Sequence, residues 1–151
     1  MKLEKSFTLS VVVTPPIGFG EGPIRSLTFI GAASGRVTGE LLNAEILPGR
    51  GGDWLTAGSD GYARPDIRHT LQTDDGAYIY IQGSGFMEFN QATTAAVSSG
   101  TPTDFADHYI RTAFTLETGD ARYSWVNHAL FVGEGRFRTG SVIEYVIYRV
   151  A

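Results

Sequence analysis

Two carboxylates in the middle of the chain are the side chains best suited to acid–base chemistry. Asp53 follows the glycine-rich run at 49–52, and Asp66 begins a segment of alternating polar and apolar residues. Burial in an apolar cavity raises the pKa of a carboxyl group, which can then act as a general acid or base near neutral pH. We therefore treat Asp53 and Asp66 as candidate catalytic residues. Each has a structural alternative, since Asp53 could cap the glycine-rich turn and Asp66 could form an ion pair with Arg68 or Arg111.

Arg68 and Arg111 are candidate ligand-binding residues. A guanidinium group either points to solvent or binds a carboxylate or enolate through two hydrogen bonds. Side chains alternate between two faces along a strand, so Asp66 and Arg68 share one face. We expect this face to line an interior cavity. The opposite face carries Ile67, His69 and Leu71.

One amide and several aromatic side chains complete the candidate binding set, although aromatic residues in a β-rich protein more often form the core. Trp125 and Asn127 share a face, and a buried amide needs a hydrogen-bond partner that a ligand or a buried water could supply. We expect both to line a pocket with Trp54, which the glycine-rich turn can bring over an opening, and with at least one candidate carboxylate. The full set is Trp54, Tyr80, Tyr109, Tyr123, Trp125, Asn127 and Tyr145.

The sequence lacks the spacing typical of metal, nucleotide and acyl-transfer sites. His69, His108 and His128 lie on separate predicted strands without HxH or HExxH spacing, which favours satisfied packing histidines. The glycines at 18–22 precede a predicted strand, whereas a phosphate-binding loop needs a helix after it. No Gly-x-Ser-x-Gly elbow and no cysteine are present. We predict no metal and no cofactor.

Length and charge narrow the class of protein. A chain of 151 residues is the size of one domain, 1–151, and can bury a sizeable core. The formal net charge of -4 and the scattered Lys and Arg residues argue against a nucleic-acid surface. Glu4 stands where a signal peptide would begin its apolar core, and no apolar run is long enough for a membrane span. We expect a cytoplasmic protein without nucleic-acid or membrane partners.

The elements that must position these side chains are almost all strands. A hairpin is predicted from residues 65–73 and 77–82, and Asp74-Asp75-Gly76 between them indicates a type I′ turn. A loop is expected at 17–23 and a connection at 133–140. A long loop with a short helix at 91–97 is expected over 88–107, near one mouth of the fold. The remaining strands are expected at 3–14, 25–31, 36–47, 108–118, 121–133 and 141–150.

This succession of strands and turns predicts an all-β fold, a single antiparallel meander closed into a barrel. Closure removes exposed strand edges, and a two-sheet sandwich is the alternative. A barrel of eight strands can hold one small ligand.

Several short motifs in one order make the chain resemble the DUF3237 family, also called UPF0311, over nearly its whole length. The motifs are Asp53-Trp54 after the glycines, Asp66-x-Arg68, Thr73-Asp74-Asp75-Gly76-Ala77, Arg111-Thr112, Glu117-Thr118-Gly119-Asp120, Arg122-Tyr123-x-Trp125-x-Asn127, Val132-Gly133-x-Gly135 and Tyr145. The resemblance implies a closed antiparallel β-barrel, of lipocalin-like or allene-oxide-cyclase-like architecture, and little about activity. This chain reads Gly49-Arg50-Gly51-Gly52-Asp53-Trp54 where the family usually reads Gly-Gly-Ala-Asp-Trp.

Two functions of different classes fit these residues. The first is a cofactor-independent lyase, isomerase or cyclase that moves protons with Asp53 or Asp66 while an arginine stabilises an anionic intermediate. The second is a carrier or sensor that binds the same kind of small molecule, aromatic or carbonyl-bearing, without chemistry. A solidly packed barrel that only mediates assembly is a third possibility.

A polar lumen would leave apolar side chains on the outer surface of the barrel, where they would favour a homo-oligomer. The candidates for this outer face are Ile67, Leu71, Val126, Leu130, Val142 and Val146.

Overall fold

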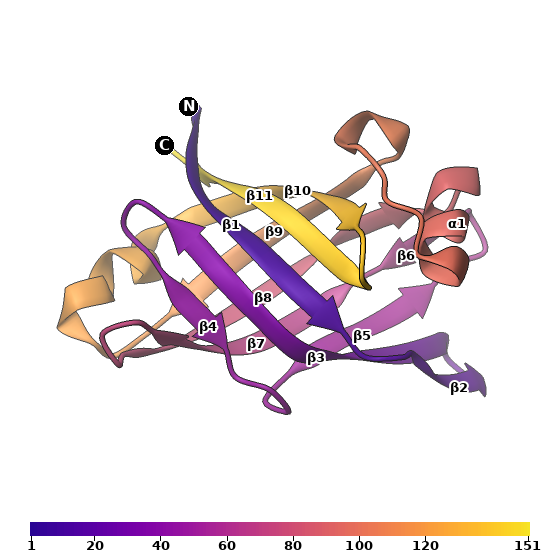
Figure 1. Ribbon diagram of the computed structural model, residues 1–151, viewed down its shortest axis with the longest axis horizontal. Helices are drawn as coiled ribbons and strands as arrows, with labels where there is room; N and C mark the ends of the chain where they lie inside the picture. The colour runs from indigo at the N-terminus through magenta and orange to yellow at the C-terminus, as the bar shows by residue number, and fades with distance from the viewer.

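The computed structural model describes all residues, 1–151, as one closed antiparallel β-barrel (Figure 1). Eleven strands form a single sheet in the order β1-β11-β10-β9-β8-β6-β5-β7-β4-β3-β2. The strands are β1 (Leu3–Val13), β2 (Ile17–Glu21), β3 (Ser26–Gly39), β4 (Ala44–Ile46), β5 (Gly52–Ala57), β6 (Tyr62–Arg64), β7 (Asp66–Thr73), β8 (Tyr78–Glu88), β9 (Ile110–Glu117), β10 (Leu130–Arg138) and β11 (Val142–Val150). The helical segments are α1 (Gln91–Ser99), η1 (Phe105–Asp107) and η2 (Ala121–His128), of which the last two are 3-10 turns.

The first strand closes the barrel. It pairs with β11 on one side and with β3 on the other, both antiparallel. Lys2 and Ala151 exchange backbone hydrogen bonds of 2.7 and 2.9 Å, so the two termini lie side by side, as Figure 1 shows. The strands β8, β9, β10 and β11 form the predicted meander. The predicted fold class is confirmed.

The two ends of the barrel are filled differently. Large apolar side chains, among them Phe7, Phe114 and Phe131, are completely buried in the interior. The η2 turn covers one end and inserts Val126, which is also completely buried. Helix α1 lies at the opposite end (Figure 1). Its residues line an open cavity there, so the barrel is not solidly packed.

Five predicted segments differ from the structure. The expected loop at 17–23 contains β2, and the two strands expected at 25–31 and 36–47 are one long strand, β3, followed by the short β4. The segment 121–133 was expected to be a strand, but its first eight residues form η2. Asp120 accepts a hydrogen bond from the backbone N–H of Arg122 at 3.0 Å and so begins the turn. The segment 133–140, expected as a connection, is mostly strand β10.

The central hairpin is confirmed as β7 and β8, but its turn differs from the predicted type. The backbone N–H of Thr73 donates to Ala77 O at 2.8 Å, which makes Asp74, Asp75 and Gly76 a three-residue loop. A type I′ turn needs positive φ at both central residues, and here only Gly76 has it, with φ of 95°. The expected helix near 91–97 is confirmed as α1. No helix in the structure has both the length and the apolar character needed to cross a membrane.

Candidate functional site

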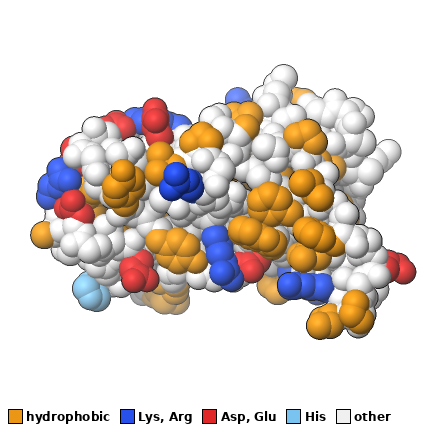
Figure 2. Space-filling model, turned by 90° about the horizontal axis from the view of Figure 1, so that it is seen from below, with side chains coloured by type: hydrophobic (Ala, Val, Ile, Leu, Met, Phe, Trp, Pro, Cys, Tyr) orange, Lys and Arg blue, Asp and Glu red, His pale blue; other side chains and the backbone are white.

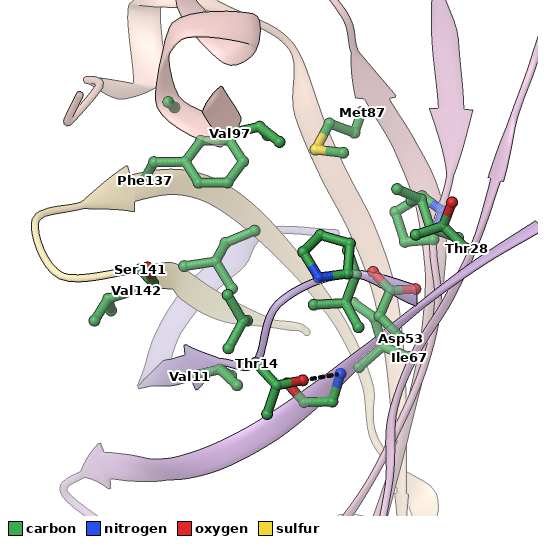
Figure 3. Close-up of a pocket in the computed structure, with 18 of the residues that line it drawn as sticks. Val11, Thr14, Thr28, Asp53, Ile67, Met87, Val97, Phe137, Ser141 and Val142 are labelled. Atoms are coloured by element: carbon green, nitrogen blue, oxygen red, sulfur yellow. Dashed lines mark hydrogen bonds between the residues drawn. The ribbon is translucent and has the colours of Figure 1, made fainter. Parts of the chain in front are cut away.

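A cavity of about 570 Å³ occupies the α1 end of the barrel. Most of its wall is aliphatic or aromatic, and it includes side chains from β1, β3, β5, β7 and β11. Figure 3 shows Phe137 and Val97 at one side of this space and Ile67 at the other. A cavity of this size and character suits a small, mostly apolar molecule.

Asp53 supplies the carboxylate of this cavity. Side chains alternate along β5, so Asp53 and Leu55 point inward while Trp54 points outward. In Figure 3 the Asp53 carboxylate lies beside Ile67, among the apolar side chains of the wall. Its Oδ1 accepts the backbone N–H of Asp66 at 2.9 Å, and Oδ2 makes no hydrogen bond. Burial raises the pKa of Asp53 to about 6, against the lowering effect of that hydrogen bond.

Two of the other polar side chains that line this cavity are buried. His69 on β7 is 5 % exposed, and burial lowers its pKa to about 4, so its imidazole is neutral at physiological pH. Tyr145 on β11 is buried, and burial raises the pKa of its hydroxyl, with a smaller contribution from the negative charge of Asp53. The Tyr145 hydroxyl therefore keeps its proton at neutral pH and can donate a hydrogen bond. All three groups line the same apolar cavity.

The open end of the cavity is shaped by α1 and by two loops. Ala96 and Val97 of α1 line it, so the prediction that the segment 88–107 lies near one mouth is confirmed. Asn90 caps the helix by accepting the backbone N–H of Thr93 at 3.0 Å. The chain after β1 is held by Thr14, whose Oγ1 accepts the backbone N–H of Gly31 at 3.0 Å (dashed in Figure 3).

The predicted orientation of β7 is wrong. Asp66 and Arg68 point to solvent, where they form an ion pair of 3.3 Å with side chains that are 39 % and 51 % exposed. Ile67, His69 and Leu71 point inward and are buried. The physical reason is that an apolar lumen takes the apolar face of an alternating strand, and the carboxylate inside comes from β5 instead.

Most of the predicted aromatic and arginine ligands also lie on the outer surface. Trp54 stacks on Phe29 with ring centroids 4.9 Å apart, at outward positions of neighbouring strands. Tyr80 and Tyr109 are exposed. Arg111 contacts Glu134 at 3.5 Å on the outside of the barrel. None of these four residues lines the cavity.

The predicted pocket around Trp125 and Asn127 is wrong as well, because both lie on η2 at the far end of the barrel. Asn127 organises a loop by accepting the backbone N–H of Thr118 at 2.8 Å and donating to Thr118 O at 2.9 Å. Trp125 packs edge-on against Phe131 with centroids 6.2 Å apart. The Tyr123 hydroxyl donates to Asp75 at 2.8 Å. These residues close one end of the fold.

Asp53 and Tyr145 are thus the two sequence-predicted residues that the structure brings to the cavity, and His69 is the residue that sequence reasoning missed. It was expected to be a satisfied packing histidine, yet its Nδ1 is buried without a hydrogen-bond partner. Its position between Ile67 and Leu71 on an apolar strand face was the available signal. No three or more His, Asp and Glu side chains cluster closely enough to hold a metal ion.

The chain matches the family described as a protein of unknown function, DUF3237, over residues 1–150. The chain belongs to this family. A UPF0311 protein from Clostridium acetobutylicum is 35% identical over 135 residues, which cover 87% of this chain and 84% of that protein. A UPF0311 protein from Rhodopseudomonas palustris is 28% identical over 131 residues, with 87% and 83% covered.

Solved structures share the DUF3237 barrel. A protein of unknown function from Rhodopseudomonas palustris superposes with a TM-score of 0.86 at 24% identity, covering 99% of this chain and 97% of that one. A β-barrel-like protein from Acinetobacter baumannii has a TM-score of 0.80 at 30% identity, with 99% and 96% covered. A protein from Penicillium herquei described as an enzyme has a TM-score of 0.67 at 18% identity, with 100% and 96% covered, and this likeness concerns the fold alone.

Proposed function

We propose that this protein is a cofactor-independent enzyme that moves a proton on a small, largely apolar, carbonyl-bearing molecule held inside the barrel, as a lyase, isomerase or cyclase does. The observation that carries the proposal is the position of Asp53, a single carboxylate with one free oxygen in an apolar cavity. A carboxylate whose pKa is about 6 is ionised at neutral pH and basic enough to accept a proton.

The proposed chemistry uses two groups that line the same cavity, Asp53 and Tyr145. Asp53 takes a proton from the carbon next to the substrate carbonyl, and the electron pair of the broken C–H bond moves onto the carbonyl oxygen. The Tyr145 hydroxyl donates a hydrogen bond to the resulting enolate. Asp53 then returns the proton to another carbon, or the enolate expels a leaving group that takes the proton from Asp53 as it departs. The Asp53 carboxylate is regenerated in both cases, and no electrons are gained or lost.

The test uses 5-nitrobenzisoxazole, a small neutral molecule whose ring opens when a base removes its C–H proton. The proton goes to the base, the N–O bond breaks, and a coloured phenolate is released. We expect catalysis whose rate rises with pH around a midpoint near 6, the pKa of Asp53. Asp53→Asn should reduce the rate at least about a hundredfold, because the amide is not a base but keeps the hydrogen bond from Asp66.

Asp66→Asn is the matched control, since it removes a carboxylate from the outer surface of the adjoining strand. It should leave the maximal rate unchanged. Equal rates in wild type and Asp53→Asn would contradict the assignment of the base. Binding of the probe inside the barrel without any turnover would show a carrier instead of an enzyme.

A further inference from the structure

The imidazole of His69 is almost completely buried, yet neither of its ring nitrogens makes a hydrogen bond within the protein. Nδ1 is fully enclosed without a partner. A buried polar group without a partner costs roughly 1–3 kcal/mol, so the burial of this imidazole is not explained by the packing of the barrel alone.

The surroundings of His69 determine which nitrogen carries the proton. An enclosed N–H without an acceptor is less favourable than an enclosed lone pair without a donor, so we assign the proton to Nε2. Nε2 also makes no hydrogen bond within the protein, but unlike Nδ1 it is not fully enclosed. His69 lines the cavity, so this N–H is available to a molecule that enters it.

Strand pairing places this donor close to the base. Asp53 on β5 pairs with Ile67 on β7, and His69 lies two residues further along on the same inward face. His69 is therefore the diagonal neighbour of Asp53, at a Cα separation of about 7–8 Å. A side chain at Gly51 would meet the Cα of His69 at 3.0 Å, which shows how closely the two strands approach there.

Tyr145 lines the same cavity from β11. Its ring packs edge-on against Phe114, with centroids 5.5 Å apart, and a side-chain interaction with Thr112 partly opposes the rise that burial causes in the pKa of its hydroxyl. The carboxylate of Asp53 is near enough to Tyr145 to raise the pKa of its hydroxyl. The other titratable residues that line the cavity are Asp53 on β5, Tyr145 on β11 and the exposed Arg138 at the end of β10.

We propose that His69 is a second catalytic residue, whose Nε2–H joins the Tyr145 hydroxyl as a neutral oxyanion hole for the enolate oxygen of the substrate. This inference rests on the proposed function and names how the same site stabilises its intermediate. Arg68 and Arg111, the cations expected to do so, lie outside the barrel. Two uncharged donors in an apolar cavity stabilise a developing negative charge without first attracting anions from solution. This pair of donors therefore suits a substrate that is neutral on entry.

A binding experiment tests the donor separately from the base. The probe is 4-nitrophenol, whose phenolate has its own absorbance, and the protein background is Asp53→Asn, which lacks the base. Donors in the cavity should lower the pKa of bound 4-nitrophenol. Adding His69→Asn should reduce the binding of the phenolate about tenfold, because asparagine extends only as far as Nδ1. Adding His69→Gln should restore most of it, because the glutamine amide N–H lies near the position of Nε2.

The same substitutions in the wild-type background should act on turnover. With 2-tetralone in deuterated water, exchange of the protons next to the carbonyl reports enolate formation. His69→Asn should lower kcat for exchange about tenfold to a hundredfold with little change in KM, and His69→Gln should recover it. His128→Asn makes the same change at an exposed histidine on η2 and should have no effect.

Two outcomes would overturn the inference. If His69→Asn leaves both the pKa of bound 4-nitrophenol and the exchange rate unchanged while the variant melts normally, His69 does not contact the oxyanion. If His69→Gln lowers phenolate binding and the exchange rate as much as His69→Asn does, the site needs the shape of the imidazole and not its Nε2–H. Neither result would affect the ring opening of 5-nitrobenzisoxazole by Asp53, so failure of this inference is distinguishable from failure of the proposed function.

Discussion

Burial of Asp53 and of His69 makes stability depend on pH over nearly the same range but in opposite directions. Burial raises the pKa of Asp53 from 3.8 to about 6, so the folded state holds a proton that the unfolded state has released between these values. The stabilisation from this group is complete below pH 3.8 and is lost as the pH rises to about 6. Burial lowers the pKa of His69 from 6.5 to about 4, so its contribution is complete above pH 6.5 and is lost as the pH falls to about 4.

These two dependences nearly cancel in the wild-type protein, and single substitutions should separate them. Each is worth about 3 kcal/mol, from a shift of roughly two units at 1.36 kcal/mol per unit. In Asp53→Asn, the free energy of unfolding should increase from pH 4 to 6.5 relative to wild type. In His69→Asn it should decrease over the same range. Urea unfolding at a series of pH values measures both.

Asp53→Asn should also be the more stable protein at pH 7.5, by about 2 kcal/mol, because it no longer buries a charge. A loss of stability at that pH would mean that the Asp53 carboxylate is better solvated in the folded protein than its burial implies.

The pairing of β8 with β9 depends on a very close approach of the two strands. Gly85 lies against the backbone of Arg111 and Thr112, and a Cβ at Gly85 would overlap the carbonyl oxygen of Arg111. Backbone atoms within a sheet cannot move aside as the end of a flexible side chain can. The close approach also brings β9 with Phe114 inward to support Tyr145.

Gly85→Ala should therefore cost at least about 2 kcal/mol of stability. Gly119→Ala is the matched control, because nothing lies within 4 Å of the position of its Cβ, and we expect a change within about 0.5 kcal/mol. Thermal unfolding of the two variants compares them directly. Similar melting temperatures would show that the strands can separate slightly at no cost.

At the scale of the whole molecule, the exposed apolar surface differs from the predicted one. Ile67, Leu71 and Val126 are buried inside the barrel, which leaves Leu130 as an exposed member of the predicted outer set. A group of exposed apolar side chains lies instead around β2, where Ile17, Phe19 and Ile24 are 59 %, 63 % and 92 % exposed. Figure 2 shows hydrophobic side chains gathered on the half of one face where Figure 1 places β2 and β5.

We still predict a homo-oligomer, in which the exposed apolar side chains around β2 lie in the contact between chains. Light scattering at micromolar concentration should give a mass above the 16.3 kDa of one chain. Phe19→Asp with Ile24→Asp should reduce it to that of a monomer without altering the melting of the barrel. A monomeric mass for the unmodified protein would contradict the prediction.

Local patterns along the sequence were sufficient for most of the strands and for the closed all-β fold class. The alternation at 66–73, the glycine in the following turn and the second alternating run predict a hairpin, because strand side chains repeat every two residues. The same period failed at 121–128, where Tyr123, Trp125 and Asn127 alternate by coincidence. There the cap at Asp120 and the contact of Trp125 with Phe131 select a 3-10 turn.

The tertiary structure decides which face of each strand points inward, and therefore which residues form the candidate site. Alternation shows that β7 has two faces but not which one is inside, and only closure of the barrel around an apolar lumen turns Asp66 and Arg68 outward. Asp53 could be named from the sequence because a glycine-rich run precedes a lone carboxylate. The basicity of Asp53 could not be predicted, because its pKa depends on desolvation by side chains from distant strands. The unpaired imidazole of His69 could not be predicted either, because its surroundings also come from distant strands.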